Sequence, residues 1–164
     1  MTLANCAGSE EDTVDVVASG HAPGVPRVEV QLSVHDGRQA VAFYEAAFGA
    51  RTCFCLGGTD ELPEVVAQLQ VGSTRFWVED ESPEHGNFSP QALKGATARL
   101  LLVVDDPAAA VERALAAGAR EVQTVAEVYG WLLGRVVDPF GHHWEIGRPI
   151  GPWPPAERDG EESQ

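Results

Sequence analysis

The sequence is poor in basic residues, in long apolar runs and in cysteine. Of its 164 residues, 11 are Lys or Arg and 25 are Asp or Glu, so the formal net charge is −14. A chain this acidic repels a phosphate backbone, which excludes non-specific nucleic-acid binding. No apolar run approaches the roughly 20 residues of a transmembrane helix, and the first residues lack the basic and apolar regions of a signal peptide.

Cysteine and nucleophile motifs are also scarce. Cys6, Cys53 and Cys55 are an odd number without the spacing of a disulfide framework or a zinc site. Neither a glycine-rich phosphate loop nor a serine nucleophile elbow is present. We therefore expect a soluble cytoplasmic protein that binds neither nucleic acid nor membranes. Cys53 and Cys55 are expected to be small buried side chains on one face of a strand.

The charge is concentrated at the two ends of the chain. Residues 1–26 hold four acidic residues and no Lys or Arg, and residues 149–164 hold four acidic residues and one Arg in a proline-rich run. We interpret 1–26 as a mobile acidic tail and 149–164 as a second acidic tail. Trp153 in the second tail is interpreted as a partly covered surface aromatic, with contact to the body or a partner as the alternative. The predicted domain is 27–148.

An internal repeat organises this domain. Residues 30–36 (VQLSVHD) resemble residues 100–106 (LLLVVDD), which separates Asp36 from Asp106 by 70 positions. Gly49 and Gly118 are 69 positions apart, and so are Gly72 and Gly141. A nearly constant offset indicates duplication. It predicts two modules, 27–80 and 96–148, joined by a loop at 81–95.

Each module has the same predicted order, βαβββ. Alternating apolar residues at 28–34 indicate a strand, Asp36 is placed to cap a helix, and Gly49 is placed to end it. In the second module Asp106 is the cap and Pro107 the first helical residue. The expected strands are 28–34, 51–56, 65–71 and 74–80, followed by 97–104, 121–125, 131–137 and 142–146. The fold class is therefore α+β.

The paired modules and the ending at 138–145 (DPFGHHWE) resemble the glyoxalase/bleomycin-resistance/dioxygenase (vicinal oxygen chelate) superfamily, and within it the PhnB-like group. The resemblance implies a curled, eight-stranded, half-barrel-like sheet with a helix packed on each module. It also implies homodimers, and a divalent metal held in a cavity by the first and last strand of each module.

Carried over by position, the resemblance places the four metal ligands at Glu29, Phe76, Arg99 and Glu145. Arg99 and Phe76 offer no lone pair to a cation. We therefore predict a metal-free centre in which Arg99 lies between Glu29 and Glu145. Two alternatives stay open: a solvated strand face without a role, and a rearranged metal site of Glu29, His143 and Glu145.

Strand alternation predicts which side chains line the cavity around this centre. Trp77 and Trp144 are expected to pack beneath the helices instead. The predicted ligand-binding residues are Glu29, Gln31, Phe76, Val78, Arg99, Leu101, Trp131, Leu133, His143 and Glu145.

These residues favour a metal-independent protein that binds a small organic molecule, of the drug-binding or resistance type, without a cofactor. The alternative is a divalent-metal lyase, isomerase or dioxygenase with unusual ligands, in which Glu145 is a ligand or base. A third hypothesis is a structural, partner-binding domain with a filled cavity. No catalytic residue is assigned.

Overall fold

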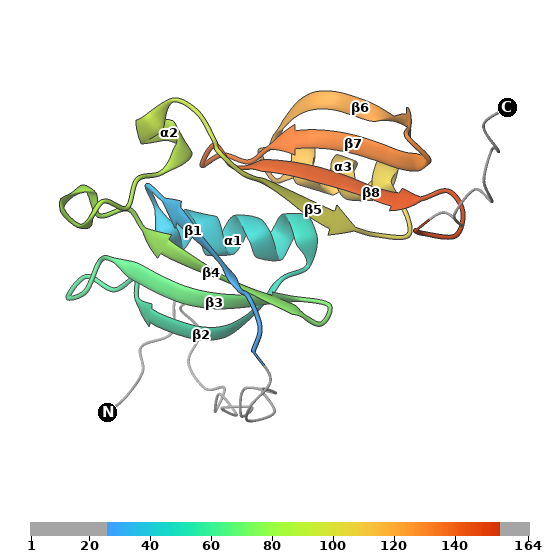
Figure 1. The fold of residues 1–164 in the computed structure, drawn as a ribbon. Helices are drawn as coiled ribbons and strands as arrows, with labels where there is room; N and C mark the ends of the chain where they lie inside the picture. The colour runs from blue at the N-terminus through green and yellow to red at the C-terminus, as the bar shows by residue number, and fades with distance from the viewer. Residues whose placement is uncertain (1–25, 155–164) are drawn as a thin grey trace, which may run out of the picture.

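The computed structural model describes residues 26–154. The predicted N-terminal tail, apart from its last residue, and the second tail after Pro154 lie outside the described residues. Figure 1 shows the elements in chain order. They are β1 (Val30–Val34), α1 (Gly37–Phe48), β2 (Arg51–Gly57), β3 (Val65–Val71), β4 (Thr74–Asp80), the short 3-10 helix η1 (Pro83–His85), α2 (Pro90–Leu93), β5 (Arg99–Val103), α3 (Pro107–Ala116), β6 (Arg120–Val128), β7 (Trp131–Val137) and β8 (His143–Pro149).

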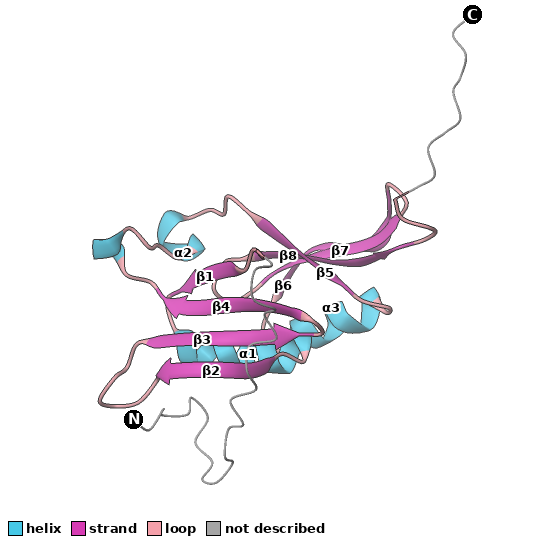
Figure 2. Ribbon diagram, turned by 60° about the horizontal axis from the view of Figure 1, so that its bottom comes forward, coloured by secondary structure: helices cyan, strands magenta, loops and turns pink. Residues whose placement is uncertain are grey.

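The predicted α+β fold of two βαβββ modules is confirmed. Its eight strands are divided between two four-stranded sheets, ordered β1-β4-β3-β2 and β5-β8-β7-β6. In each sheet the first strand pairs in parallel with the last, and the other pairs are antiparallel. Figure 2 shows α1 and α3 on the same side of the sheets, and the two helices contact each other. None of the helices within 26–154 has the length and apolar character to cross a membrane.

The helices begin and end close to the predicted residues. Asp36 accepts a hydrogen bond from the backbone of Gln39 at 2.9 Å, and Asp106 accepts one from the backbone of Ala109 at 3.0 Å. These caps satisfy backbone donors that have no partner inside a helix. Gly49 ends α1 with φ of 63°, a conformation that costs glycine little.

An aromatic cluster joins the two modules. Tyr44 and Phe48 on α1 lie with ring centroids 5.6 and 4.6 Å from the ring of Trp144 on β8. Phe140, in the turn before β8, lies 6.2 Å from Phe43 of α1. All five rings are buried, so the apolar face of α1 packs on both modules. The two sheets therefore share one hydrophobic core.

A buried carboxylate lies in this cluster. Asp138 is 4% exposed, and its Oδ2 accepts hydrogen bonds from the Tyr44 hydroxyl at 2.6 Å and the Trp144 indole at 3.0 Å. Its Oδ1 accepts from the backbone N–H groups of Phe140 and His142, both at 2.9 Å. Asp138 also begins a turn, in which Gly141 N donates to Asp138 O at 3.1 Å. Four donors offset the cost of burying the charge.

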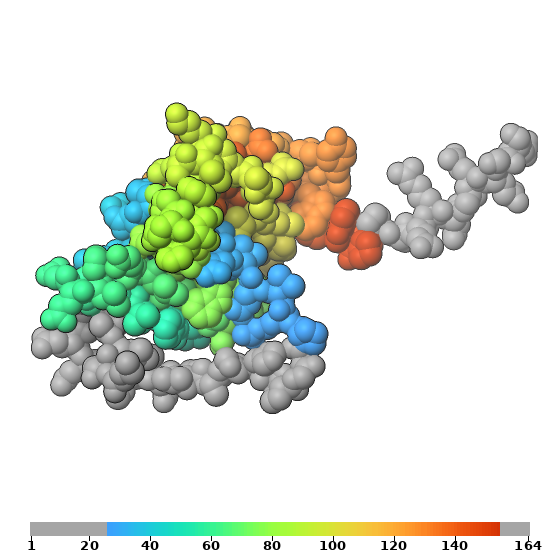
Figure 3. Space-filling view, turned by 60° about the vertical axis from the view of Figure 1, so that its left-hand side comes forward, coloured from blue at the N-terminus to red at the C-terminus, as the bar shows by residue number. Residues whose placement is uncertain are grey.

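The loop at 81–95, which we call the linker, joins the two modules. Polar contacts connect this linker and the end of β1 to the second module. The ring Nε2 of His142 lies 3.0 Å from the carbonyl oxygen of Ser33, and Gln91 of α2 donates to the carbonyl of Pro139. At the start of the linker, hydrogen bonds from Ser89 hold the pKa of Glu81 below its ordinary value. In Figure 3 the linker, green to yellow, lies across the boundary between the modules.

Replacing Tyr44 with Phe should lower the free energy of unfolding by about 1.5–3 kcal/mol, because Asp138 loses a hydrogen bond made to a buried charge. Urea denaturation measures the change. Tyr129→Phe is the matched control, since Tyr129 is 95% exposed, and its stability should equal that of the parent. Equal stability of the two variants would contradict the role given to Tyr44.

The same pair should be sensitive to alkali. Burial, together with the charge of Asp138, raises the pKa of Tyr44 well above its ordinary value of 10.0. The unfolded chain then loses this proton at lower pH than the folded chain, so the contribution of Tyr44 is complete below about pH 10 and declines above it. Between about pH 9 and about pH 11, the unfolding free energy of the parent should fall more steeply than that of Tyr44→Phe.

Candidate functional site

Each sheet has one face covered by its helix and an opposite face, which we call the inner face. In β8, Trp144 and Ile146 are buried against the helices, so His143 and Glu145 belong to the inner face. In β4, Phe76 and Val78 are buried in the core, and Phe76 packs against Tyr44 with ring centroids 5.4 Å apart. The inner face of β4 therefore carries the residues that alternate with them, Arg75, Trp77 and Glu79.

The prediction that Phe76 and Val78 line the cavity is wrong, and so is the prediction that Trp77 packs beneath a helix. Both predictions assume that Gly72 and Gly141 occupy equivalent positions in their turns. Two residues separate β3 from β4, whereas five separate β7 from β8. The odd difference reverses the alternation of side chains. Strand register shows that Trp77, not Phe76, corresponds to Glu145.

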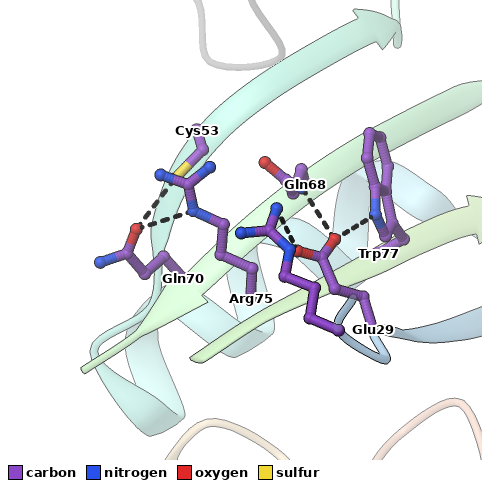
Figure 4. Close-up of polar contacts among 7 residues, drawn as sticks. Glu29, Cys53, Gln68, Gln70, Arg75 and Trp77 are labelled. Atoms are coloured by element: carbon purple, nitrogen blue, oxygen red, sulfur yellow. Dashed lines mark hydrogen bonds and ion pairs between the residues drawn. The ribbon is translucent and has the colours of Figure 1, made fainter. Parts of the chain in front are cut away.

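The inner face of the first module is organised around Glu29. Its Oε2 accepts hydrogen bonds from the Trp77 indole at 2.8 Å and the Gln68 amide at 3.0 Å. Its Oε1 lies 2.7 Å from an Arg27 guanidinium nitrogen. Figure 4 shows Trp77 and Gln68 converging on the carboxylate. Gln31, a predicted site residue on the same face, donates to Glu79 at 2.7 Å.

A second polar group lies beside Glu29 on this face (Figure 4). The side-chain amide oxygen of Gln70, Oε1, accepts hydrogen bonds from Arg75 at 3.2 Å and from Arg51 at 3.4 Å. The free thiol of Cys53 lies 3.7 Å from the same oxygen.

The prediction that Cys53 and Cys55 share a strand face is wrong. Cys53 contacts the inner-face residue Gln70, whereas Cys55 packs in the hydrophobic core. The pairing of β2 with β3 shifts register between Thr52 and Phe54, as in a β-bulge. The extra residue changes which side chains face the core.

The inner face of the second module is more apolar. Arg99 and Glu145 form an ion pair at 3.0 Å, with side chains 57% and 26% exposed. Leu101 and Val103 on β5 are 50% and 59% exposed. Arg135 pairs across from Glu145, and among the described residues its buried Nε has no hydrogen-bond partner.

The remaining predicted residues of this module lie on the same face. Leu133 pairs across from Gly147 and Trp131 from Pro149 on β8, while His143 pairs with Arg99 and Val137. Trp153 is 55% exposed and packs edge-on against Trp131, with ring centroids 5.4 Å apart. An aromatic and aliphatic surface therefore borders the Arg99–Glu145 pair.

The predicted centre of Glu29, Arg99 and Glu145 is only partly formed. Arg99 and Glu145 are paired, but Glu29 lies on the other sheet, where Arg27 is its ionic partner. The division of the strands into two sheets separates them within one chain. The prediction of one three-residue network within the chain is therefore wrong, and its Arg–Glu pair is confirmed.

A divalent metal does not fit the side chains at the four corresponding positions. Two of the four are Trp77 and Arg99, which supply no ligand atom. The carboxylates Glu29 and Glu145 belong to different sheets, and each is engaged by a neighbouring side chain. Within the described part of the chain, no three His, Cys, Asp or Glu side chains are grouped to hold a metal ion, so Glu29, His143 and Glu145 form no such group.

A cavity of about 360 Å³ opens at one end of the first inner face. It is lined by Arg27, Val28, Glu29, Gln70, Ser73, Thr74 and Arg75. Sequence analysis missed Arg75, Gln70 and Trp77. The alternation of Arg75, Trp77 and Glu79 with Phe76 and Val78 carries this information once burial shows which set faces the helix.

Comparison with known proteins matches residues 29–147 to the glyoxalase-like domain. The chain belongs to this family. The match spans both modules and contains the inner-face positions from Glu29 to Gly147, but not Arg27 and Val28, which line the cavity, nor Pro149 at the end of β8.

The relatives of this glyoxalase-like protein extend over most of its length. It is 33% identical over 129 residues to an uncharacterised protein of Mycobacterium bovis, covering 76% of this chain and 84% of the relative. An Arabidopsis thaliana protein of known crystal structure is 28% identical, with a TM-score of 0.57 over 76% of this chain and 99% of that one.

A further solved structure shows the fold alone. The fosfomycin resistance protein FosX of Listeria monocytogenes, solved with Mn(II) and a dihydroxypropylphosphonic acid, is 16% identical. Its TM-score is 0.58 over 76% of this chain and 89% of its own.

Removal of the Glu29 carboxylate should destabilise the first module. Glu29→Ala leaves Trp77 and Gln68 without their acceptor in a half-buried site, which should cost about 1–3 kcal/mol of unfolding free energy. Glu79→Ala is the control on the same face, because Glu79 accepts one exposed hydrogen bond and its loss should cost less than about 0.5 kcal/mol. Urea denaturation compares them, and a similar cost for both would contradict the organising role of Glu29.

Proposed function

We propose that this glyoxalase-like protein binds a small organic molecule against its inner faces without a metal, as a drug-binding or resistance-type protein. The proposal is carried by the side chains at the four positions that correspond to the metal ligands of the family. These positions are occupied by two bonded pairs, Trp77 with Glu29 and Arg99 with Glu145. Each carboxylate is held by a donor from its own sheet, and the other member of each pair, Trp77 or Arg99, offers no lone pair to a cation.

The residues beside these pairs suit recognition of a molecule that is partly apolar and partly polar. Trp77 and Phe54 on the first inner face lie with ring centroids 6.0 Å apart, and Trp131 and Leu133 lie on the second. Small-molecule sites commonly combine apolar walls with a few polar groups that fix orientation. Arg99 would orient an anionic or carbonyl group, and Glu145 would accept hydrogen bonds from a donor. The ending at 138–145 supports assignment to the PhnB-like group.

We infer that the second copy of this chain covers the exposed apolar residues of β5. Leu101 is 50% exposed and Val103 is 59% exposed, and β5 is an edge strand. β1 is likewise the edge of the first sheet, so the first module of one protomer can lie opposite the second module of its partner. That arrangement would bring Glu29 of one protomer toward the Arg99–Glu145 pair of the other and enclose the ligand between two inner faces.

Metal analysis and ligand binding test the main proposal together. Protein purified without chelator should contain far less than one equivalent of any divalent metal by elemental analysis, and Glu145→Ala should contain the same. Equilibrium dialysis against aromatic compounds and peptide antibiotics should find a ligand whose binding is unchanged by EDTA. A stoichiometric metal that is lost in Glu145→Ala would contradict the proposal and favour a metal-dependent lyase, isomerase or dioxygenase. The absence of any bound compound would also count against it.

Sedimentation velocity tests the dimer. The parent protein should sediment as a species of twice the chain mass. The Leu101→Asp variant should sediment as a monomer, because the substitution leaves an unpaired charge at an apolar interface. Leu93→Asp is the matched control, since Leu93 is 59% exposed and belongs to α2, outside both sheets. A parent that is monomeric at all concentrations, or a dimer unaffected by Leu101→Asp, would overturn the assignment.

A further inference from the structure

The first inner face carries two guanidinium groups that are held by a neutral acceptor. Arg75 and Arg51 both donate hydrogen bonds to the side-chain amide oxygen of Gln70. The amide nitrogen of Gln70 donates to the Gly72 carbonyl at 2.7 Å, which fixes the amide with its oxygen toward the arginines. Among the described residues, neither Arg75 nor Arg51 has a carboxylate within 4 Å. Within residues 26–154 their charges are therefore uncompensated.

Arg75 also lines a space large enough for a ligand group. The cavity of about 360 Å³ is bordered by Arg75, Arg27 and Gln70, and by the turn residues Ser73 and Thr74. Arg75 is half-buried and uses its Nε for Gln70, so the four N–H bonds of its two Nη atoms are available to a ligand. Two hydroxyl groups at the rim add further donors.

The carboxylate of Glu29 borders the same cavity, so its charge must be counted. Glu29 is paired with Arg27 at 2.7 Å, and its other oxygen is capped by Trp77 and Gln68. This acid is therefore neutralised by its own partner, and among the described residues Arg75 and Arg51 remain as a local excess of positive charge. In a chain with a net charge of −14, a half-buried positive site of this kind is unusual.

We propose that this cavity binds an oxyanion group of the ligand, a carboxylate or a phosphate, with Arg75 as the principal donor. The inference rests on the proposed function, because it names the chemical class of the molecule that lies on the inner face. The fork of N–H groups on Arg matches the two oxygens of a carboxylate or a phosphate. Trp77 is two residues along β4 on the same face, where it would contact an apolar ring attached to the oxyanion.

The test titrates the full chain with three probes: benzoate, benzamide and inorganic phosphate. Benzoate and benzamide share a ring and differ in charge, and phosphate carries charge without a ring. The readout is the ¹H–¹⁵N signal of the Trp77 indole, assigned by its loss in Trp77→Phe. Benzoate should bind at least about tenfold more tightly than benzamide, in keeping with a charge-assisted hydrogen bond, and phosphate should bind at the same site.

Arg75→Gln should weaken benzoate and phosphate binding by at least about tenfold and leave benzamide unchanged. Arg75→Lys keeps the charge but not the two-pronged donor and should fall between the parent and Arg75→Gln. Arg113→Gln is the matched control, because it removes the same charge from an exposed position on α3 and should bind all probes as the parent does. An unchanged indole signal in the absence of probe shows that each variant keeps its fold.

The outcomes separate this inference from the proposed function. Equal binding of benzoate and benzamide, or unaltered oxyanion binding in Arg75→Gln, overturns the oxyanion site and leaves a neutral ligand on the inner face possible. Oxyanion binding that depends on Arg75, with no organic compound bound in dialysis, supports the site and counts against the proposed function. Failure of both anions to perturb the protein overturns the oxyanion site outright.

Discussion

The carboxylate of Asp138 is the interaction on which the arrangement of the two modules depends. It is buried, and it collects donors from α1 of the first module and from the turn and last strand of the second. A buried charge is tolerated only when its hydrogen bonds are complete, so Tyr44 and Trp144 must be held at fixed positions. Because those rings also form the shared aromatic core, the polar and apolar interactions fix the same geometry. The inner faces are thereby presented on a single rigid support.

On that support the two modules place different chemistry at equivalent positions. The first pairs Glu29 with Trp77 and adds amides and guanidinium groups, whereas the second pairs Arg99 with Glu145 among exposed aliphatic side chains. Duplication supplied one backbone twice, and the side chains then diverged. A ligand that lies between such faces meets polar, charged recognition on one side and apolar contact on the other. We propose that this asymmetry serves selective binding of a ligand and not coordination of a metal ion.

The extent to which sequence predicts this molecule differs between backbone and site. Helix α1 was predictable because Asp36 and Gly49 satisfy local requirements of a helix end, and the strands followed from alternation. The assignment of Phe76 and Trp77 to faces was not, because it depends on the number of residues in the preceding turn. Cys53 was misassigned because a bulge adds a residue to β2. Each error comes from an odd number of residues added to a turn or a strand, and an odd number is enough to move a strand side chain to the opposite face.

The sequence by itself determined the duplication, the α+β class and the helix caps, because these follow from residues close in sequence or from strand period. The pairing of Arg99 with Glu145 was expected only from the family resemblance, and the structure confirms it. Tertiary structure alone decided that Glu29 is held by Trp77 and Gln68 and that Asp138 is a buried acceptor. It also decided that Arg75 lines a cavity and has no carboxylate partner in the part of the chain that the structure describes. The physical reason is that burial and hydrogen-bond partners depend on how distant segments pack. Sequence period gives the spacing of side chains along a strand but not which face the core will cover.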